Sequence, residues 1–125
     1  MIRLGIVGYR NFIDYTSLKA AVLKVLQEWN IELTNVKYIV SGGAIGTDTL
    51  AEKFAKEFNI PPLIYKPEYN LYHGKAPLLR NTTIVENSTH LIAFPSVNGR
   101  GTQDTIKKAI DKNIPIKVLY IDNKN

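Results

Sequence analysis

The chain has 125 residues, which is enough for one domain to bury a hydrophobic core without a disulfide or a structural metal. It has no cysteine, which excludes disulfides and thiolate metal sites, and His73 and His90 lie too far apart for metal-ligand spacing, so we expect no metal. The net charge of +5 favours anionic partners, although lysines spread along the whole chain also fit an ordinary solvated surface.

Apolar runs and helical patterns alternate along the chain. In order, the sequence predicts a strand over 4–7, a helix over 18–29 capped near 14–17, a strand over 37–41, a helix over 50–58, a strand over 63–65, an irregular stretch over 66–77, a helix over 78–87, a strand over 90–94, a helix over 102–112 and a strand over 116–121. This alternation implies parallel βαβ units. We therefore predict an α/β fold: a single-domain (1–125), Rossmann-like, doubly wound parallel sheet of about five strands with helices on both faces.

The apolar run near the N-terminus is short and ends at a glycine, so we interpret it as the first strand and not as a signal peptide. No later stretch approaches membrane-spanning length. We expect a soluble, cytoplasmic protein without a membrane partner.

The segment SGGAIGTD, residues 41–48, joins a predicted strand to a predicted helix. Gly42 and Gly43 can adopt positive φ angles and admit a ligand close to the backbone, while Gly46 allows close packing where the helix begins. The helix offers free N–H groups and the positive end of its dipole to an anion, and Thr47 or Asp48 could cap it. The spacing matches neither the dinucleotide fingerprint nor a P-loop. The alternative is a tight turn with a capped helix and no ligand.

Two further loops should meet this turn, because ligands bind doubly wound sheets at the carboxyl ends of the strands. In the loop 8–12, Arg10 could project toward an anion, or it could be an ordinary loop arginine. In the loop 94–104, two glycines loosen the chain and Thr102 opens a helix, with Asp104 one turn away. Thr102 and Asp104 could equally be simple helix-capping residues.

The tyrosine-containing segment 69–81 lies between these loops in the sequence. Arg80 could supply a charge to a phosphate, Asn81 an amide to a sugar or base, and Tyr72 a ring for stacking. Alternatively, Arg80 is a surface cation and the tyrosines cover apolar strand edges. Two glycine-rich helix starts together with Arg10 and Arg80 favour an anionic, phosphate-bearing ligand.

The predicted site therefore combines these three loops with the tyrosine-containing segment. The candidate ligand-binding residues are Gly8, Tyr9, Arg10, Asn11, Ser41, Gly42, Gly43, Ala44, Gly46, Thr47, Asp48, Tyr72, Lys75, Arg80, Asn81, Pro95, Gly99, Gly101 and Thr102. The candidate catalytic residues are Asp104 and Arg80.

Four segments carry a resemblance to a known group: GYRNFIDY, VSGGAIGTDTLAEKFA, YHGKAPLLRNTTIVENSTHLIAFP and GRGTQDTIKKAIDKNIPIKVLYI. They resemble the YspA-like branch of the SLOG superfamily, Rossmann-like proteins related to DNA-processing protein A and the lonely guy phosphoribohydrolases. The similarity runs from about Arg3 to Ile121. It implies that a nucleotide or a nucleotide-derived ligand binds across the three loops. Tyr9 stands where this branch usually has a serine, which would reshape the phosphate end.

The resemblance implies an enzymatic activity less directly. The lonely guy enzymes cleave N-glycosidic bonds with a Pro-Gly-Gly-x-Gly-Thr-x-x-Glu helix start, and here the position of the glutamate is Thr105, with Asp104 one residue earlier. A carboxylate displaced by one residue leaves the helix about 100° away.

We therefore expect a nucleotide-binding module with a sensor, sequestering or processing role, without a cofactor and as a homo-oligomer. The alternative is an N-glycosidase or deoxyribosyltransferase acting on nucleoside monophosphates, in which Asp104 acts on the oxocarbenium-like centre, Arg80 orients the substrate and the glycine turn holds the phosphate, with Asp48 also in reach. Single-stranded DNA binding is a further alternative, but the sequence lacks a basic stripe interleaved with aromatic residues, and we do not expect a nucleic-acid partner.

Overall fold

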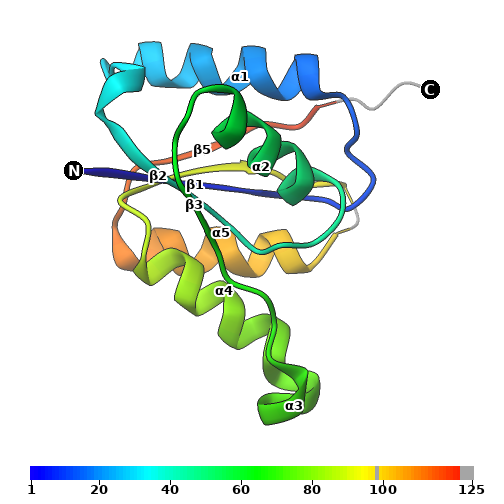
Figure 1. The fold of residues 1–125 in the computed structure, drawn as a ribbon. Coiled ribbons are helices and arrows are strands. Elements are labelled where there is room, and N and C mark those ends of the chain that lie inside the picture. Colours follow the sequence, from blue (N-terminus) through cyan, green and yellow to red (C-terminus); the bar gives the residue numbers. More distant parts are fainter. Residues whose placement is uncertain (98, 122–125) are drawn as a thin grey trace.

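Five parallel strands form one sheet in the computed structural model, which describes residues 1–97 and 99–121 (Figure 1). The elements in chain order are β1 (Ile2–Gly8), α1 (Tyr15–Glu28), η1 (Leu33–Asn35), β2 (Val36–Ser41), α2 (Thr47–Glu57), β3 (Pro62–Ile64), α3 (Tyr69–Tyr72), η2 (His73–Lys75), α4 (Ala76–Glu86), β4 (His90–Phe94), α5 (Gly101–Lys112) and β5 (Ile116–Val118), where η marks a 3-10 turn. The strand order is β3-β2-β1-β4-β5, and each neighbouring pair is parallel. The predicted doubly wound α/β fold is confirmed.

The helices cover both faces of the sheet, with α1 and α2 on one side and α4 and α5 on the other (Figure 1). The side chains of β1 pack on opposite faces of the sheet: Leu4 and Ile6 belong to the core under α1 and α2, and Val7 belongs to the core under α4 and α5. Strands buried on both faces are continuous apolar runs, which is why the sequence pattern identified them. Among the described residues, no helix is both long and apolar enough to cross a membrane.

The N-terminus of α1 is capped as the sequence predicted. The Asp14 carboxylate accepts hydrogen bonds from the Ser17 backbone N–H at 3.2 Å and from the Ser17 hydroxyl at 2.7 Å. A side chain that satisfies a free N–H of the first turn stabilises the helix start. This cap ends the β1–α1 loop at a defined residue.

Several predicted boundaries were wrong. The elements expected to begin at residues 4, 18 and 50 begin at Ile2, Tyr15 and Thr47. The final strand ends at Val118 and not at Ile121, although Leu119 and Ile121 still pack against the core under α1 and α2. The segment 66–77 is not irregular throughout, because it contains α3, η2 and the start of α4. At the final strand the apolar pattern reports burial, whereas backbone hydrogen bonding decides where the strand ends.

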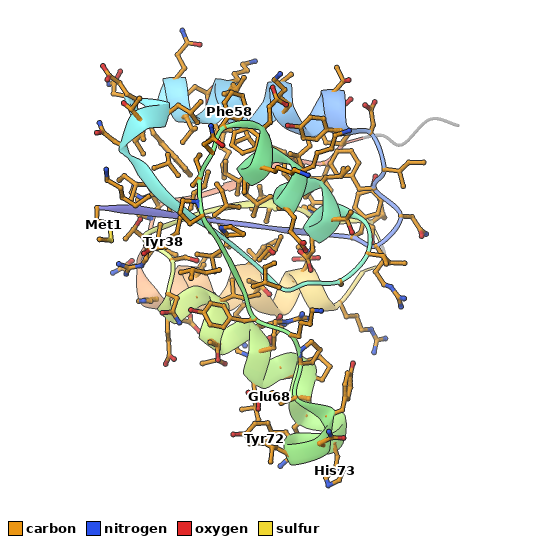
Figure 2. All side chains as sticks on the ribbon, viewed as in Figure 1. Met1, Tyr38, Phe58, Glu68, Tyr72 and His73 are labelled. Carbon is orange, nitrogen blue, oxygen red and sulfur yellow. The ribbon has the colours of Figure 1, made fainter. Side chains whose placement is uncertain are left out.

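The segment formed by α3 and η2 projects away from the body of the molecule (Figure 1). Tyr72 and His73 lie at its tip, below the start of α4, and Glu68 lies just above them (Figure 2). Both α3 and η2 pack mainly against α4 and against each other. This placement removes the tip residues from the carboxyl edge of the sheet.

The strand order reverses between β1 and β4, since the chain moves outward from β1 to β3 and then returns to the other side of β1. Gly8, the last residue of β1, is in register with Phe94, the last residue of β4. The loops that follow these two strands therefore leave the sheet side by side. Such a switch point is where doubly wound sheets bind ligands.

Candidate functional site

A cleft of about 830 Å³ opens at the switch point. Three segments, one at the end of each of the strands β1, β2 and β3, contribute residues 7–11, residues 42–45 with Asp48, and Lys66, Pro67 and Tyr69 to its lining. Two helices complete the lining: α4 with Arg80, Asn81 and Ile84, and α5, around whose start Ser96, residues 99–102 and Thr105 lie. The three loops predicted to converge all reach this cleft. Its volume lies in the range of small-molecule sites.

The predicted site residues divide into two groups. Those that line the cleft are Gly8, Tyr9, Arg10, Asn11, Gly42, Gly43, Ala44, Asp48, Arg80, Asn81, Gly99, Gly101 and Thr102. Those outside its lining are Ser41, Gly46, Thr47, Tyr72, Lys75, Pro95 and Asp104. Ser41, Thr47 and Pro95 are buried beneath the cleft.

The charge of the lining is strongly positive. Four cationic side chains, Arg10, Lys66, Arg80 and Arg100, face one carboxylate, Asp48, among the described residues that line the cleft. A concave surface with an excess of one charge concentrates ligands of the opposite charge. Phosphate-bearing molecules fit this distribution. Across residues 1–97 and 99–121, no group of three or more His, Cys, Asp or Glu residues could hold a metal ion.

The backbone of the glycine turn, the segment 41–48, holds a carboxylate of the same segment by a hydrogen bond. Asp48 is only 7% exposed, and its Oδ2 accepts a hydrogen bond from the Ala44 N–H at 3.1 Å. Burial raises the pKa of Asp48 to about 6, although the Ala44 hydrogen bond and the charge of Arg80 oppose this shift. The turn that the sequence presented as a phosphate cradle therefore already contains an acidic group.

The glycines of this turn serve different purposes. Positive φ angles occur at Gly43 (72°) and Gly46 (83°), so the prediction was right for Gly43 and wrong for Gly42. At Gly42 the absence of a side chain is what matters, because a Cβ there would overlap the guanidinium group of Arg80. Gly42 thus lets α4 approach the turn closely.

The start of α2 is covered by the loop after β1. The Tyr9 carbonyl accepts hydrogen bonds from the Thr47 N–H at 3.2 Å and from the Thr47 hydroxyl at 2.9 Å. A Cβ at Gly46 would overlap the Arg10 carbonyl, which shows how closely the two loops pack. Gly46 is the N-cap residue and no side chain caps α2, so the prediction that Thr47 or Asp48 caps it was wrong. The Tyr9 and Arg10 carbonyl oxygens therefore lie at the start of α2, where the sequence suggested a bound anion.

The start of α5 differs from the start of α2 in how its first turn is covered. Its N-cap residue is Arg100, and no side chain of the described residues makes a capping hydrogen bond there, although Asp104 lies in the first turn, as the capping alternative expected. Gly101 and Thr102, the first two residues of the helix, line the cleft. The first N–H groups of a helix have no intrahelical partner and attract anions. The start of α5 therefore suits an anion better than the start of α2 does.

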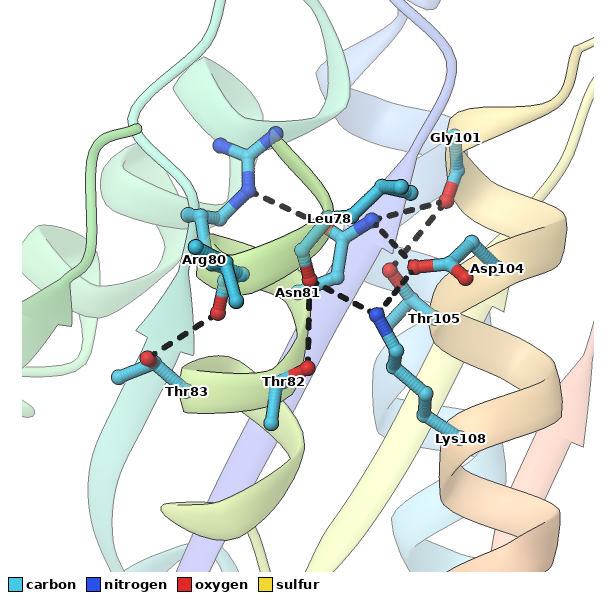
Figure 3. Close-up of polar contacts among 10 residues, drawn as sticks. Leu78, Arg80, Asn81, Thr82, Thr83, Gly101, Asp104, Thr105 and Lys108 are labelled. Atoms are coloured by element: carbon cyan, nitrogen blue, oxygen red, sulfur yellow. Dashed lines mark hydrogen bonds and ion pairs between the residues drawn. The ribbon is translucent and has the colours of Figure 1, made fainter. Parts of the chain in front are cut away.

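Arg80 connects α4 to the glycine turn. Its Nη1 donates to the Gly42 carbonyl at 2.8 Å, and its Nε donates to Asn81 Oδ1 at 3.0 Å. Asn81 is buried, and its Nδ2 donates to the Gly101 carbonyl at 3.3 Å and to Asp104 Oδ2 at 3.1 Å (Figure 3). The Asn81 amide therefore ties α4 to α5 within the protein.

Asp104 faces α4 and not the cleft. Its Oδ2 accepts a hydrogen bond from the Asn81 amide and forms an ion pair with Lys108 Nζ at 2.8 Å (Figure 3). Lys108 Nζ also donates a hydrogen bond to the Leu78 carbonyl at 2.8 Å. The carboxylate thus belongs to a network that joins the two helices. Asp48 is the carboxylate that lines the cleft.

Several cleft residues were missed at the sequence level, notably Lys66, Tyr69 and Arg100. Tyr72 and Lys75 were chosen instead, but they lie on the projecting segment. The signal for Lys66 was available: it follows β3 closely, as the other loops follow their strands, and the carboxyl ends of parallel strands share one edge. The position of Tyr69 depends on the short helix α3, which the sequence pattern did not reveal.

No protein-family model matches the chain. Gene 61 protein of Mycobacterium phage D29 is 29% identical over 122 residues, which cover 93% of this chain and 94% of that protein. The X-ray structure of TM1055, a structural genomics target, matches with a TM-score of 0.64 at 17% identity, over 93% of this chain and 72% of that one. TM1055 has a Rossmann-like α/β fold, and this similarity concerns the fold alone.

Proposed function

We propose that the protein binds a nucleotide or a nucleotide-derived small molecule through its phosphate at the switch-point cleft. The observation that carries the proposal is the lining of the cleft: among the described residues, four cations and one carboxylate surround a concave space, and the start of α5 there has no side-chain cap. Arg100 and Gly101 provide charge and N–H groups at one place, a combination suited to phosphate. The resemblance to YspA-like SLOG proteins supports the same class of ligand.

The experiment is isothermal titration calorimetry of the purified chain against nucleoside mono- and diphosphates. We expect binding that weakens at least tenfold in the double variant Arg10→Ala/Arg100→Ala, because each side chain lines the cleft and is exposed. The control variant is Lys24→Ala, which removes an exposed cation of α1 that does not line the cleft. Absence of binding by every phosphorylated nucleoside would refute the proposal.

Native mass spectrometry of the freshly purified protein complements this titration. It detects a ligand that remains bound through purification, and it counts the subunits, which tests the homo-oligomer that we also propose. A co-purified mass equal to a phosphorylated nucleoside derivative would support the assignment directly.

A second candidate function is cleavage of the N-glycosidic bond of a nucleoside monophosphate. The observation in its favour is that Asp48 lines the cleft with a pKa near 6, a value suited to proton transfer at neutral pH, and lies within the electrostatic influence of Arg80. Chromatography of nucleoside monophosphates incubated with the protein should then show free base. Release that persists in Asp48→Asn would remove Asp48 from such a reaction, and no release at all would leave binding as the function.

A further inference from the structure

The lining of the cleft has three chemically different parts. The start of α5 with Arg100 presents N–H groups and a cation. Tyr69 and Ile45 present a ring and an aliphatic side chain, and their exposed fractions are 57% and 62%. Asp48 and Arg80 form a polar floor over the glycine turn. A nucleotide also has three parts, namely a phosphate, a flat base and a sugar with hydroxyl groups.

The polar floor is built around Gly42. A Cβ at this position would lie 3.0 Å from Asp48 Oδ2 and would overlap the Arg80 guanidinium, so both charged groups lie beside the Gly42 backbone, and the charge of Arg80 acts on the Asp48 carboxylate. The carbonyl of Gly42 holds the guanidinium through the 2.8 Å hydrogen bond. The Ala44 N–H holds Asp48 Oδ2. Both groups are therefore fixed in position before any ligand arrives.

A buried carboxylate restricts which chemical group of a ligand can bind beside it. It repels a phosphate, and when ionised it accepts hydrogen bonds but donates none. The group that binds at Asp48 must therefore be a hydrogen-bond donor without negative charge. Among the parts of a nucleotide, the two neighbouring hydroxyls of a ribose fit best, because a carboxylate can accept from both, as the acidic residue of dinucleotide-binding sites does with ribose. The base is better matched by Tyr69 and Ile45, since aromatic and aliphatic surfaces pack on its flat face.

We propose that Asp48 is a specificity-determining residue whose carboxylate accepts hydrogen bonds from the ribose hydroxyls of the nucleotide, while the phosphate binds at the start of α5. The ligand is then a ribonucleotide or a derivative that keeps a free ribose diol. This orientation reverses the one suggested by the glycine turn in the sequence, which placed the phosphate at residues 41–48. The inference rests on the proposed function, because it assigns the parts of the ligand within the same cleft.

The test compares ligands that differ only in the hydroxyls. Affinities are measured by calorimetry at pH 7.5 for AMP, GMP, CMP and UMP and for the 2′,3′-dideoxy counterpart of each. Loss of hydrogen bonds to a charged acceptor corresponds to about 10- to 100-fold in affinity, so we expect the ribonucleotide to bind more tightly by that factor. In Asp48→Asn the ratio should fall to within about threefold, because the amide keeps an oxygen for the Ala44 N–H but has lost its charge.

The matched control is Glu57→Gln, which removes a carboxylate from the same helix at a residue outside the cleft lining and should leave the ratio unchanged. Equal affinities of the two members of every pair in the unmodified protein would overturn the ribose assignment and leave the proposed function standing. Failure of every ligand to bind would overturn both. A ratio that persists in a folded Asp48→Asn protein would also overturn the role of Asp48.

The unmodified protein offers a second readout, should Asp48→Asn fail to fold. Below its pKa the carboxyl group becomes a weaker acceptor, so the preference for the ribonucleotide should shrink between pH 7.5 and pH 5. The charged groups that act on Asp48 are Arg80 from α4 and Glu52 from its own helix. Titration of the phosphate affects both members of a pair equally and cancels in the ratio. A ratio that stays constant over this range would contradict the proposal.

Discussion

The guanidinium group of Arg80 donates a hydrogen bond of 2.8 Å to the carbonyl of Gly42, a residue 38 positions earlier in the chain. This bond joins α4 to the glycine turn across the cleft floor, and it exists only because Gly42 has no side chain in the space that the guanidinium occupies. Arg80 is therefore both a part of the fold and a cation of the cleft. Its two roles can be separated by experiment.

Arg80→Ala should lower both stability and ligand affinity. It removes the hydrogen bonds to Gly42 and Asn81 and leaves Asp48 without its nearby cation, which we expect to cost about 1–3 kcal/mol in the free energy of unfolding. Urea denaturation measures this loss, and calorimetry with AMP measures the affinity. Arg100→Ala is the matched control, because Arg100 is exposed and should change affinity alone. Equal stability losses in both variants would contradict the structural role of Arg80.

Thr47→Val should destabilise the protein by about 1–2 kcal/mol. The Thr47 side chain is fully buried and its hydroxyl donates to the Tyr9 carbonyl, so an isosteric valine removes this buried hydrogen bond and leaves the carbonyl with the Thr47 N–H as its donor from α2. Thr49→Val tests the same change at an exposed hydroxyl, which donates to the Ala44 carbonyl at 3.2 Å. Its urea midpoint should stay close to that of the unmodified protein. A smaller effect at Thr47 than at Thr49 would show that the two loops are not held together in this way.

Gly46→Ala should be severely destabilising, on the order of 3 kcal/mol or more. Its φ of 83° disfavours a side chain, and the added methyl group would overlap the Arg10 carbonyl, so the loops after β1 and β2 would have to separate. Gly74→Ala provides the comparison, because a Cβ there meets nothing within 4 Å. Thermal unfolding followed by circular dichroism distinguishes them. Similar melting temperatures for both variants would exclude the close packing at Gly46.

Asp48 should make the protein less stable at neutral pH than at pH 4 to 5. Its pKa is raised to about 6 in the folded state, above its ordinary value of 3.8, so the folded state binds the proton more tightly than the unfolded state. The stabilisation from this group is therefore present at low pH and is lost as the pH rises from about 4 through 6. The complete shift corresponds to roughly 3 kcal/mol.

The measurement is urea denaturation at pH 4, 5, 6 and 7.5 for the unmodified protein and for Asp48→Asn. Other groups also titrate, including His90, whose pKa is lowered by burial, so the difference between the two proteins isolates Asp48. We expect that difference to move in favour of Asp48→Asn as the pH rises. A difference that is constant with pH would show that Asp48 titrates at its ordinary value.

The sequence alone determined the strands, the longer helices and their arrangement in layers. Apolar runs such as 90–94 and the helical spacing in 102–112 depend on local periodicity, and the alternation of strands with helices restricts the sheet to parallel crossovers. It also identified the loops after β1, β2 and β4 as the edge at which the cleft lies, because the direction of parallel strands follows from that alternation. These features require no knowledge of side-chain contacts.

Tertiary structure decided which groups of those loops face the cleft. The amide and carbonyl groups of a turn can be satisfied by a ligand or by the protein itself, and the sequence does not distinguish these cases. Here Tyr9 satisfies the start of α2, Ala44 binds Asp48, and Asn81 with Lys108 holds Asp104 against α4. These interactions depend on the packing of the folded chain, and at the start of α5, which lies at the cleft, no side chain of the described residues makes a capping hydrogen bond.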